Sequence, residues 1–280
     1  MTRIHFHRVR TVIALAAVLF VAGCATNPVT GRSQLMLLPE SEAITASARA
    51  YTQMLTPLAK EGRINNDVAM TERVVRITER LLPHAIKYRP ETAKWAWEVK
   101  VIDDPKTVNA FCMAGGKMAV YSGLIEKVQP TDDELAQVMG HEIAHALSAH
   151  TVERMSIALA TNVAITAVAV TQDRPGIALT GAALAAALAI QLPNSRQAET
   201  ESDRIGIELA ARAGYNPYAA ASLWDKMGKA SGAGNSKFDW LSTHPAPAKR
   251  RETLLQLAPQ MMPYYEAKGE RPVFPLKVSK

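Results

Sequence analysis

Most of the chain has apolar residues at the three- and four-residue spacing of amphipathic helices, and short apolar stretches bounded by turn residues lie near its middle. The helical spacing predicts helices at residues 40–60, 67–82, 132 to about 154, 195–214, 218–229 and 247–257. Strands are predicted at 95–102 and 117–122, with a short apolar stretch at 108–113 between them. We therefore expect an α+β fold that is mainly helical and contains a small antiparallel or mixed sheet.

The helix that begins at residue 132 carries the clearest chemical signal. Thr131 and Glu134 have the spacing of a capping box, which places the start of the helix. His141 and His145 are four residues apart, so they share one helix face and both imidazoles can bind one metal ion. Their neighbours are mostly apolar, where unpaired imidazoles would be costly. Glu142 completes the HExxH pattern of zinc peptidases and can act as general base toward a water molecule.

A third protein ligand is expected from a later helix, where Glu199 and Asp203 are four residues apart on one face. Glu199 is predicted to bind the metal, and Asp203 to orient one of the ligating imidazoles through a hydrogen bond. Glu201 points about 200° away from Glu199, so we expect it on a solvated face. His150 comes after the histidine pair and faces elsewhere, either on the helix surface or in contact with a ligand from outside.

Two Ala-rich apolar stretches, 157–170 and 177–192, are separated by Gln172-Asp173-Arg174-Pro175-Gly176. Each stretch is shorter than the run of about 18–20 apolar residues that spans a bilayer. We predict an αα-hairpin of two buried or partly lipid-facing helices. A pair of helices that touches the membrane is the alternative.

The start of the chain has the pattern of a bacterial lipoprotein leader. Three arginines form a basic start, an apolar stretch follows, and Val21-Ala22-Gly23 precedes Cys24 in the manner of a lipobox. We predict a signal peptide at 1–23, a lipid on Cys24 and a tether at 24–39. A plain signal peptide or an uncleaved anchor helix remains the alternative.

Length, charge and cysteine content limit the protein class. The chain has 280 residues, 48% of them hydrophobic, which is enough for one substantial core. The formal charge of +6 falls to +3 if Arg3, Arg8 and Arg10 leave with the leader, and no motif of a nucleic-acid-binding module is present. We therefore expect no nucleic-acid partner. Once Cys24 is acylated, Cys112 is the remaining thiol, so no intramolecular disulfide can form.

Three motifs follow one another along the chain: His141-Glu142-Ile143-Ala144-His145, the segment 195–206 with its ExxxD spacing, and Thr243-His244-Pro245 with Arg250. Together they resemble the M48 family of zinc metallopeptidases, most closely its bacterial lipoprotein-type members. The resemblance covers about residues 27–255. Asn109-Ala110-Phe111 and Gly115-Gly116 match a further stretch of the family pattern, and Cys112-Met113-Ala114 departs from it.

The resemblance implies a zincin-type core in which the small sheet packs on the HExxH helix. It implies one zinc ion per chain, with His141, His145 and Glu199 as ligands and Asp203 behind them. It also implies that one strand is a sheet edge on which a substrate peptide adds by β-augmentation. That strand comprises Lys117, Met118, Ala119, Val120 and Tyr121.

His244 and Arg250 lie far along the chain from the HExxH motif, but the resemblance implies that both lie near the zinc. His244 would approach the metal in a resting state, and His244 or Arg250 would stabilise the oxyanion of the reaction. Without the resemblance, His244-Pro245 would be interpreted as a surface turn. We expect the peptidase domain at 40–262 and an extended tail at 263–280.

The function expected from these observations is a zinc endopeptidase that cleaves misfolded or unassembled cell-envelope proteins. No Asp follows Cys24, which in lipoproteins of this type implies the outer membrane, with the body of the protein in the periplasm. Other outer-membrane assembly components are further candidate partners. Two alternatives stay open: a metal-stabilised chaperone or assembly factor with little proteolysis, and a structural zinc protein. Glu142 favours the enzyme, because a structural site needs no base.

Overall fold

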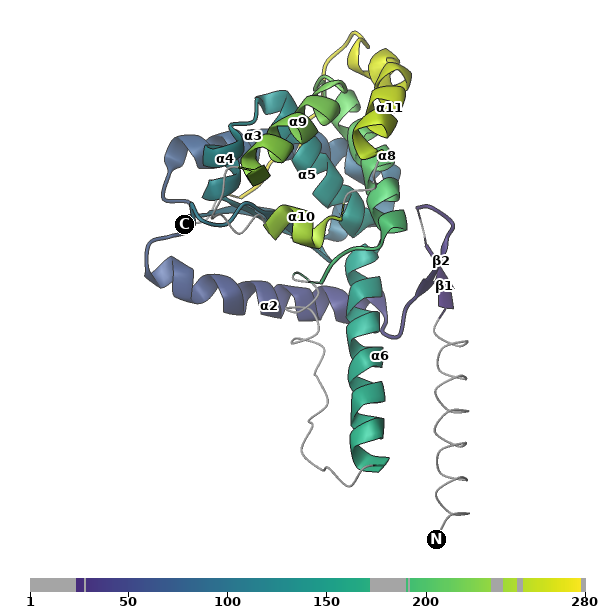
Figure 1. The fold of residues 1–280 in the computed structure, drawn as a ribbon. Coiled ribbons are helices and arrows are strands. Elements are labelled where there is room, and N and C mark those ends of the chain that lie inside the picture. Colours follow the sequence, from purple (N-terminus) through teal and green to yellow (C-terminus); the bar gives the residue numbers. More distant parts are fainter. Residues whose placement is uncertain are drawn as a thin grey trace.

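The computed structural model describes residues 24–27, 29–171, 190, 192–232, 239–245 and 249–277. The predicted leader at 1–23 and most of the second stretch of the expected hairpin, 177–192, lie outside the described residues. The described part is a helical body with a small sheet, from which helix α6 (His150–Thr171) projects (Figure 1). This confirms the mainly helical α+β fold. Within the described ranges, no helix is both long and apolar enough to cross a bilayer.

The helices α3, α5 and α8 begin at residues whose side chains cap them. Thr131 and Glu134 form the expected capping box at the start of α5, with both reciprocal hydrogen bonds present. The side chains of Asp67 and Ser195 cap α3 and α8 in the same position. Apart from α6, the described helices are α2 (Glu40–Lys60), α3 (Val68–Tyr88), η1 (Pro90–Lys94), α4 (Ser122–Val128), α5 (Asp132–Leu147), α8 (Arg196–Arg212), α9 (Ala219–Gly232), α10 (Asp239–Thr243) and α11 (Arg250–Tyr265).

Several helix boundaries differ from the sequence-based expectation. The helix expected from 132 to about 154 is two helices, α5 and α6, because the chain turns between them at Ala149, which has a φ of +52°. Helices α3 and α11 continue past their expected ends, through Pro83 in one and Pro259 and Pro263 in the other. Burial of their apolar faces outweighs the hydrogen bond that each proline removes. The short helices α4 and α10 were not expected.

A three-stranded mixed sheet lies on one side of α5. Its strands are β3 (Glu98–Ile102), β4 (Ala110–Met113) and β5 (Lys117–Tyr121), in the order β3-β5-β4. β5 pairs with β3 in parallel and with β4 in antiparallel register. β4 packs against α5, so the sheet supports the histidine-bearing helix as expected.

The position of β5 corrects one expectation. Residues Lys117, Met118, Ala119, Val120 and Tyr121 were expected to form a sheet edge open to a substrate peptide. They instead form the central strand, whose two sides pair with β3 and β4. A strand that is paired on both sides has no free backbone groups for β-augmentation. The outer strand nearest the histidine-bearing helix is β4.

Helix α5 lies in the middle of the body, between α3 and α8 and against the sheet (Figure 1). All its side chains from Glu134 to Leu147 are buried. It crosses α8 in direct backbone contact: a Cβ added at Gly140 would lie 2.8 Å from the carbonyl oxygen of Gly206. A Cβ at Gly206 would lie 2.7 Å from the backbone nitrogen of His141. The two helices can therefore approach this closely only with glycine at both positions.

The segment expected to be a tether is partly packed against the body. β1 (Cys24–Thr26) and β2 (Ser33–Leu35) form an antiparallel hairpin. Asn27 and Gln34 are each only 2% exposed. Residues of this hairpin, well before α2, are therefore packed against the body.

Candidate metal centre

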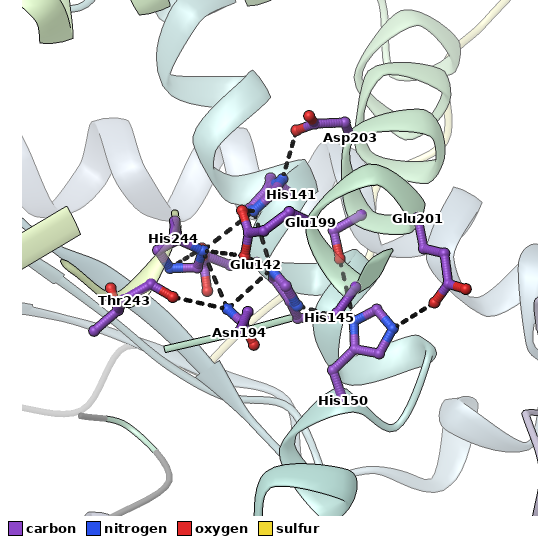
Figure 2. A network of polar contacts seen from close by, with 12 residues as sticks. His141, Glu142, His145, His150, Asn194, Glu199, Glu201, Asp203, Thr243 and His244 are labelled. Atoms are coloured by element: carbon purple, nitrogen blue, oxygen red, sulfur yellow. Dashed lines mark hydrogen bonds and ion pairs between the residues drawn. The ribbon is translucent and has the colours of Figure 1, made fainter. Parts of the chain in front are cut away.

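The crossing of α5 and α8 brings three expected ligands together (Figure 2). The Nε2 atoms of His141 and His145 are 3.0 Å apart. Glu199 Oε1 lies 3.3 Å from His145 Nε2, and its Oε2 lies 3.4 Å from His141 Nε2. All three side chains are buried, and that of Glu199 has no exposed surface. The four-residue spacing on α5 and the placement of Glu199 on the facing side of α8 produce this convergence.

His244, which follows α10, adds a fourth donor atom to the cluster. Its Nδ1 lies 3.4 Å from His141 Nε2 and 3.0 Å from Glu199 Oε1. The imidazole stacks on the indole of Trp240, with ring centroids 4.1 Å apart and planes 23° apart. The side chain of His244 is therefore held inside the cluster and does not form a surface turn.

The donor set fits a metal ion. His141, His145, Glu199 and His244 each offer one atom, and these atoms lie within 4.8 Å of one another. A tetrahedral zinc ion with bonds of about 2.0–2.1 Å places its ligand atoms about 3.4 Å apart. Five contacts between atoms of these four residues, which involve both oxygens of Glu199, have lengths of 3.0 to 3.4 Å and are close to that geometry. Three buried imidazoles and a carboxylate that converge in this way are a typical zinc donor set, and a cation between them would satisfy the converging lone pairs.

Glu142 lies on the same turn of α5, at the margin of the cluster. Among the described residues, its Oε1 has no hydrogen-bond partner, and the ring nitrogen Nε2 of His244 lies 3.4 Å from it. Burial raises the pKa of the Glu142 carboxyl above its ordinary value. A buried carboxyl group that lies beside the candidate metal ligands, and has one oxygen without a hydrogen bond, is suited to accept a proton from a water molecule.

Asp203 and Arg250 support the ligands from behind. Asp203 Oδ1 lies 3.0 Å from His141 Nδ1, as an orienting role requires. Arg250 donates to Glu199 Oε2 at 2.7 Å and to Asp203 Oδ1 at 2.6 Å, and its guanidinium lies over the Trp224 ring. These contacts favour Arg250 as the residue that holds both carboxylates in place.

The carboxylates also change the acid–base properties of the cluster. Burial acts to lower the pKa of His141, but the hydrogen bonds with Asp203 and Glu199 raise it to about 9. Burial acts to raise the pKa of Glu199, but the charge of His244 and the hydrogen bond with His141 hold it far below its ordinary value. Glu199 is therefore an anion within the cluster.

Two residues outside the cluster differ from their expectation. Glu201 was expected on a solvated face, but its side chain is only 14% exposed and its Oε2 lies 2.8 Å from His150 Nε2. The reason is the turn after α5, which brings His150 back against α8. His150 Nδ1 lies 2.9 Å from Nδ1 of His145. Of the two positions considered for His150, the structure shows the one in contact with a ligand.

Sequence reasoning missed two residues of the site. The Nδ2 atom of Asn194 lies 3.3 Å from His244 Nδ1, and its backbone N–H donates to Thr243 O at 2.9 Å. Asn194 lies just before the ligand helix, and a polar residue at that position was the available sequence signal. Trp240 carries the stacked ring beneath His244. Trp240 lies one helical turn before His244 in the sequence, and this spacing was the available signal that the two rings are in contact. Trp240 belongs to none of the motifs identified in the sequence.

Comparison with known proteins gives an independent result. The model of the family described as Peptidase family M48 matches residues 69–258. "Metalloendopeptidase OMA1, mitochondrial" of Bos taurus is 32% identical over 89% of this chain and 48% of its own length. "Putative beta-barrel assembly-enhancing protease" of Vibrio cholerae is 29% identical over 72% of this chain and 41% of its own. "Metalloprotease LoiP" of Escherichia coli is 36% identical over 52% and 57%. The chain therefore spans about half the length of these relatives.

Proposed function

The chain belongs to peptidase family M48, and from that premise we propose that it is a zinc-dependent endopeptidase acting on misfolded or unassembled cell-envelope proteins. The family expected from the sequence is thereby confirmed. The observation that carries the proposal is the cluster of His141, His145 and Glu199, with Glu142 free to act as a base beside it. A purely structural metal site would not need that base.

In the proposed reaction, His141, His145 and Glu199 would hold one zinc ion. When bound, zinc supplies Lewis-acid activation that makes water a nucleophile near neutral pH. Glu142 accepts the proton of the attacking water and passes it to the leaving amine. Arg250 and Asp203 hold the ligand side chains throughout, through contacts of 2.6 to 3.0 Å.

His244 gives the proposed enzyme a resting state. Its Nδ1 occupies the position of a fourth donor, which an attacking water molecule would otherwise take. Release of His244 would require movement of the segment around α10. A peptidase that is closed in this way spares folded neighbours until a substrate displaces the histidine.

The substrate class and the location are part of the proposal. Relatives of this chain include one named as a putative β-barrel assembly-enhancing protease. The lipobox-like Val21-Ala22-Gly23 before Cys24 supports a lipid anchor in the outer membrane, with the domain in the periplasm. We therefore propose unfolded envelope proteins as substrates and other assembly components as partners. A chaperone with the same fold and little proteolysis is the second candidate, favoured by the closed position of His244.

Metal analysis combined with a cleavage assay tests the proposal. The purified protein should contain one zinc ion per chain and degrade casein or an unfolded outer-membrane protein, and a chelator should abolish the cleavage.

Glu142→Gln should keep zinc and fold but lose cleavage, because only the proton acceptor is removed. Glu126→Gln, at an exposed position on α4, is the matched control. Cleavage by Glu142→Gln at the wild-type rate would refute the mechanism, and holdase activity without cleavage in the wild type would favour the chaperone.

A further inference from the structure

A chain of ion pairs connects the N-terminal hairpin to α6 and α8. Arg32, just before β2, donates from Nη1 and Nη2 to the two carboxylate oxygens of Glu153 at 2.9 and 2.7 Å. Its Nε donates to Glu201 Oε1 at 3.0 Å. All three side chains are between 14% and 16% exposed, so solvent screens these contacts only in part. One arginine of the hairpin therefore holds carboxylates on two different helices.

The same hairpin holds the turn that follows α5. Asn27 Nδ2 donates to the carbonyl oxygen of Ser148 at 2.6 Å, and Gln34 Nε2 donates to the same oxygen at 3.1 Å. The next residue, Ala149, has the positive φ that turns the chain into α6. Side chains from the hairpin thus satisfy a carbonyl group at the end of the metal-ligand helix and stabilise the turn.

That turn places His150 between Glu201 and the ligand His145 (Figure 2). Glu201 Oε2 lies 2.8 Å from His150 Nε2, and His150 Nδ1 lies 2.9 Å from His145 Nδ1. The carboxylate can only accept, so His150 Nε2 carries a proton and its Nδ1 accepts. His145 Nδ1 then donates, which leaves the Nε2 lone pair of His145 directed at the metal cluster. One arrangement of protons therefore satisfies the hydrogen bonds from Glu201 through His150 to His145.

We propose that Arg32, Glu201 and His150 are positioning residues that fix the orientation and tautomer of the metal ligand His145. The N-terminal hairpin is then part of the metal centre, because Arg32 in this hairpin holds Glu201, which in turn holds His150. The inference rests on the proposed zinc site, although it concerns residues that do not touch the metal. Ligands that are held by hydrogen-bonded partners bind metal about 10- to 100-fold more tightly than ligands without them.

The test measures zinc affinity by competition with a chromogenic chelator, together with the thermal midpoint of the metal-free protein. His150→Phe keeps a ring of similar size but removes both hydrogen bonds, so zinc affinity should fall about 10- to 100-fold. His150→Gln can still accept from His145 and donate to Glu201, so it should recover most of that loss. Arg32→Met should also lower zinc affinity, but by a smaller factor than His150→Phe. Arg251→Met, which removes an exposed ion pair with Asp225, is the matched control and should bind zinc like the wild type.

Each result decides between roles. Unchanged zinc affinity in His150→Phe and Arg32→Met would overturn the inference and leave the proposed enzyme intact. A purely structural role would lower the thermal midpoint of the metal-free protein, and His150→Gln would then give no selective recovery of zinc affinity. That outcome would also overturn the inference. A wild-type protein that binds no zinc would refute the proposed function and the inference together.

Discussion

At the scale of single residues, each ligand of the cluster has its own partner on the side away from the metal position. His141 has Asp203, His145 has His150, and Glu199 has Arg250. These partners remove the rotational freedom of the ligands before any metal binds. His244 differs, because a stacked ring holds it and it follows a short helix. It is therefore the donor whose removal tests function without dismantling the site.

The variant His244→Ala should raise the basal rate of cleavage of an unfolded substrate several-fold while zinc content stays at one per chain. The physical reason is that the fourth position near the metal becomes open to water and substrate. Cleavage rate and zinc content are measured on the same preparation. His84→Ala, on α3 beside Arg212 and Arg271, is the control.

The competing role of His244 predicts the opposite result. If it stabilises the oxyanion, His244→Ala should lose on the order of 10²-fold in turnover with zinc retained. An unchanged rate would contradict both roles.

At the scale of elements, the crossing of α5 and α8 determines the geometry of the site. Gly140 and Gly206 allow the two backbones to touch, and this contact places Glu199 opposite the histidines. Substitution at this crossing should act on stability and on metal binding together.

The variant Gly206→Ala should lower the free energy of unfolding by about 1–3 kcal/mol, since its methyl group would overlap the backbone of α5. Zinc affinity should fall as well, because α8 must move away from His141. Gly228→Ala on α9 is the control, because its added Cβ meets no described atom within 4 Å. That control should gain about 0.5–1 kcal/mol. Chemical denaturation of the metal-free proteins measures the free energy of unfolding of both variants. A Gly206→Ala variant as stable as the wild type would contradict the expected overlap.

The elements also show what the sequence could and could not predict. The capping box at Thr131, the histidine pair and the carboxylates of α8 depend on local spacing, which the residue pattern contains directly. The order β3-β5-β4 depends on pairing between distant segments, and the pattern of Lys117–Tyr121 is the same for a central and an edge strand. The turn at Ala149 was missed because its partners, Asn27 and Gln34, lie more than a hundred residues earlier.

At the scale of the whole molecule, the site combines contributions from both ends of the described chain. The hairpin β1–β2 contacts the turn after α5, and Arg250 at the start of α11 contacts the ligand on α8. Cys24, the predicted site of the lipid, is the first residue of that hairpin. Attachment to a membrane would therefore occur next to residues that support the metal centre.

Cells grown with labelled palmitate should incorporate the label into the wild-type protein, and Cys24→Ser should block incorporation, since the thiol is the acceptor of the lipid. Cys112→Ser is the control, because that thiol is buried in the folded domain. A mature N-terminus found by mass spectrometry at a residue other than Cys24 would contradict the prediction.

The order of the site residues along the chain also governs when the site can form during synthesis. A ribosome releases the N-terminus first, so the histidine pair emerges long before Glu199 and Arg250. A nascent chain that ends ahead of Glu199 has two imidazoles but lacks the carboxylate that completes the donor set. The proposed hydrolytic site can therefore form only after Glu199 has been synthesised, and a chain that is terminated before this residue lacks one of the three proposed metal ligands.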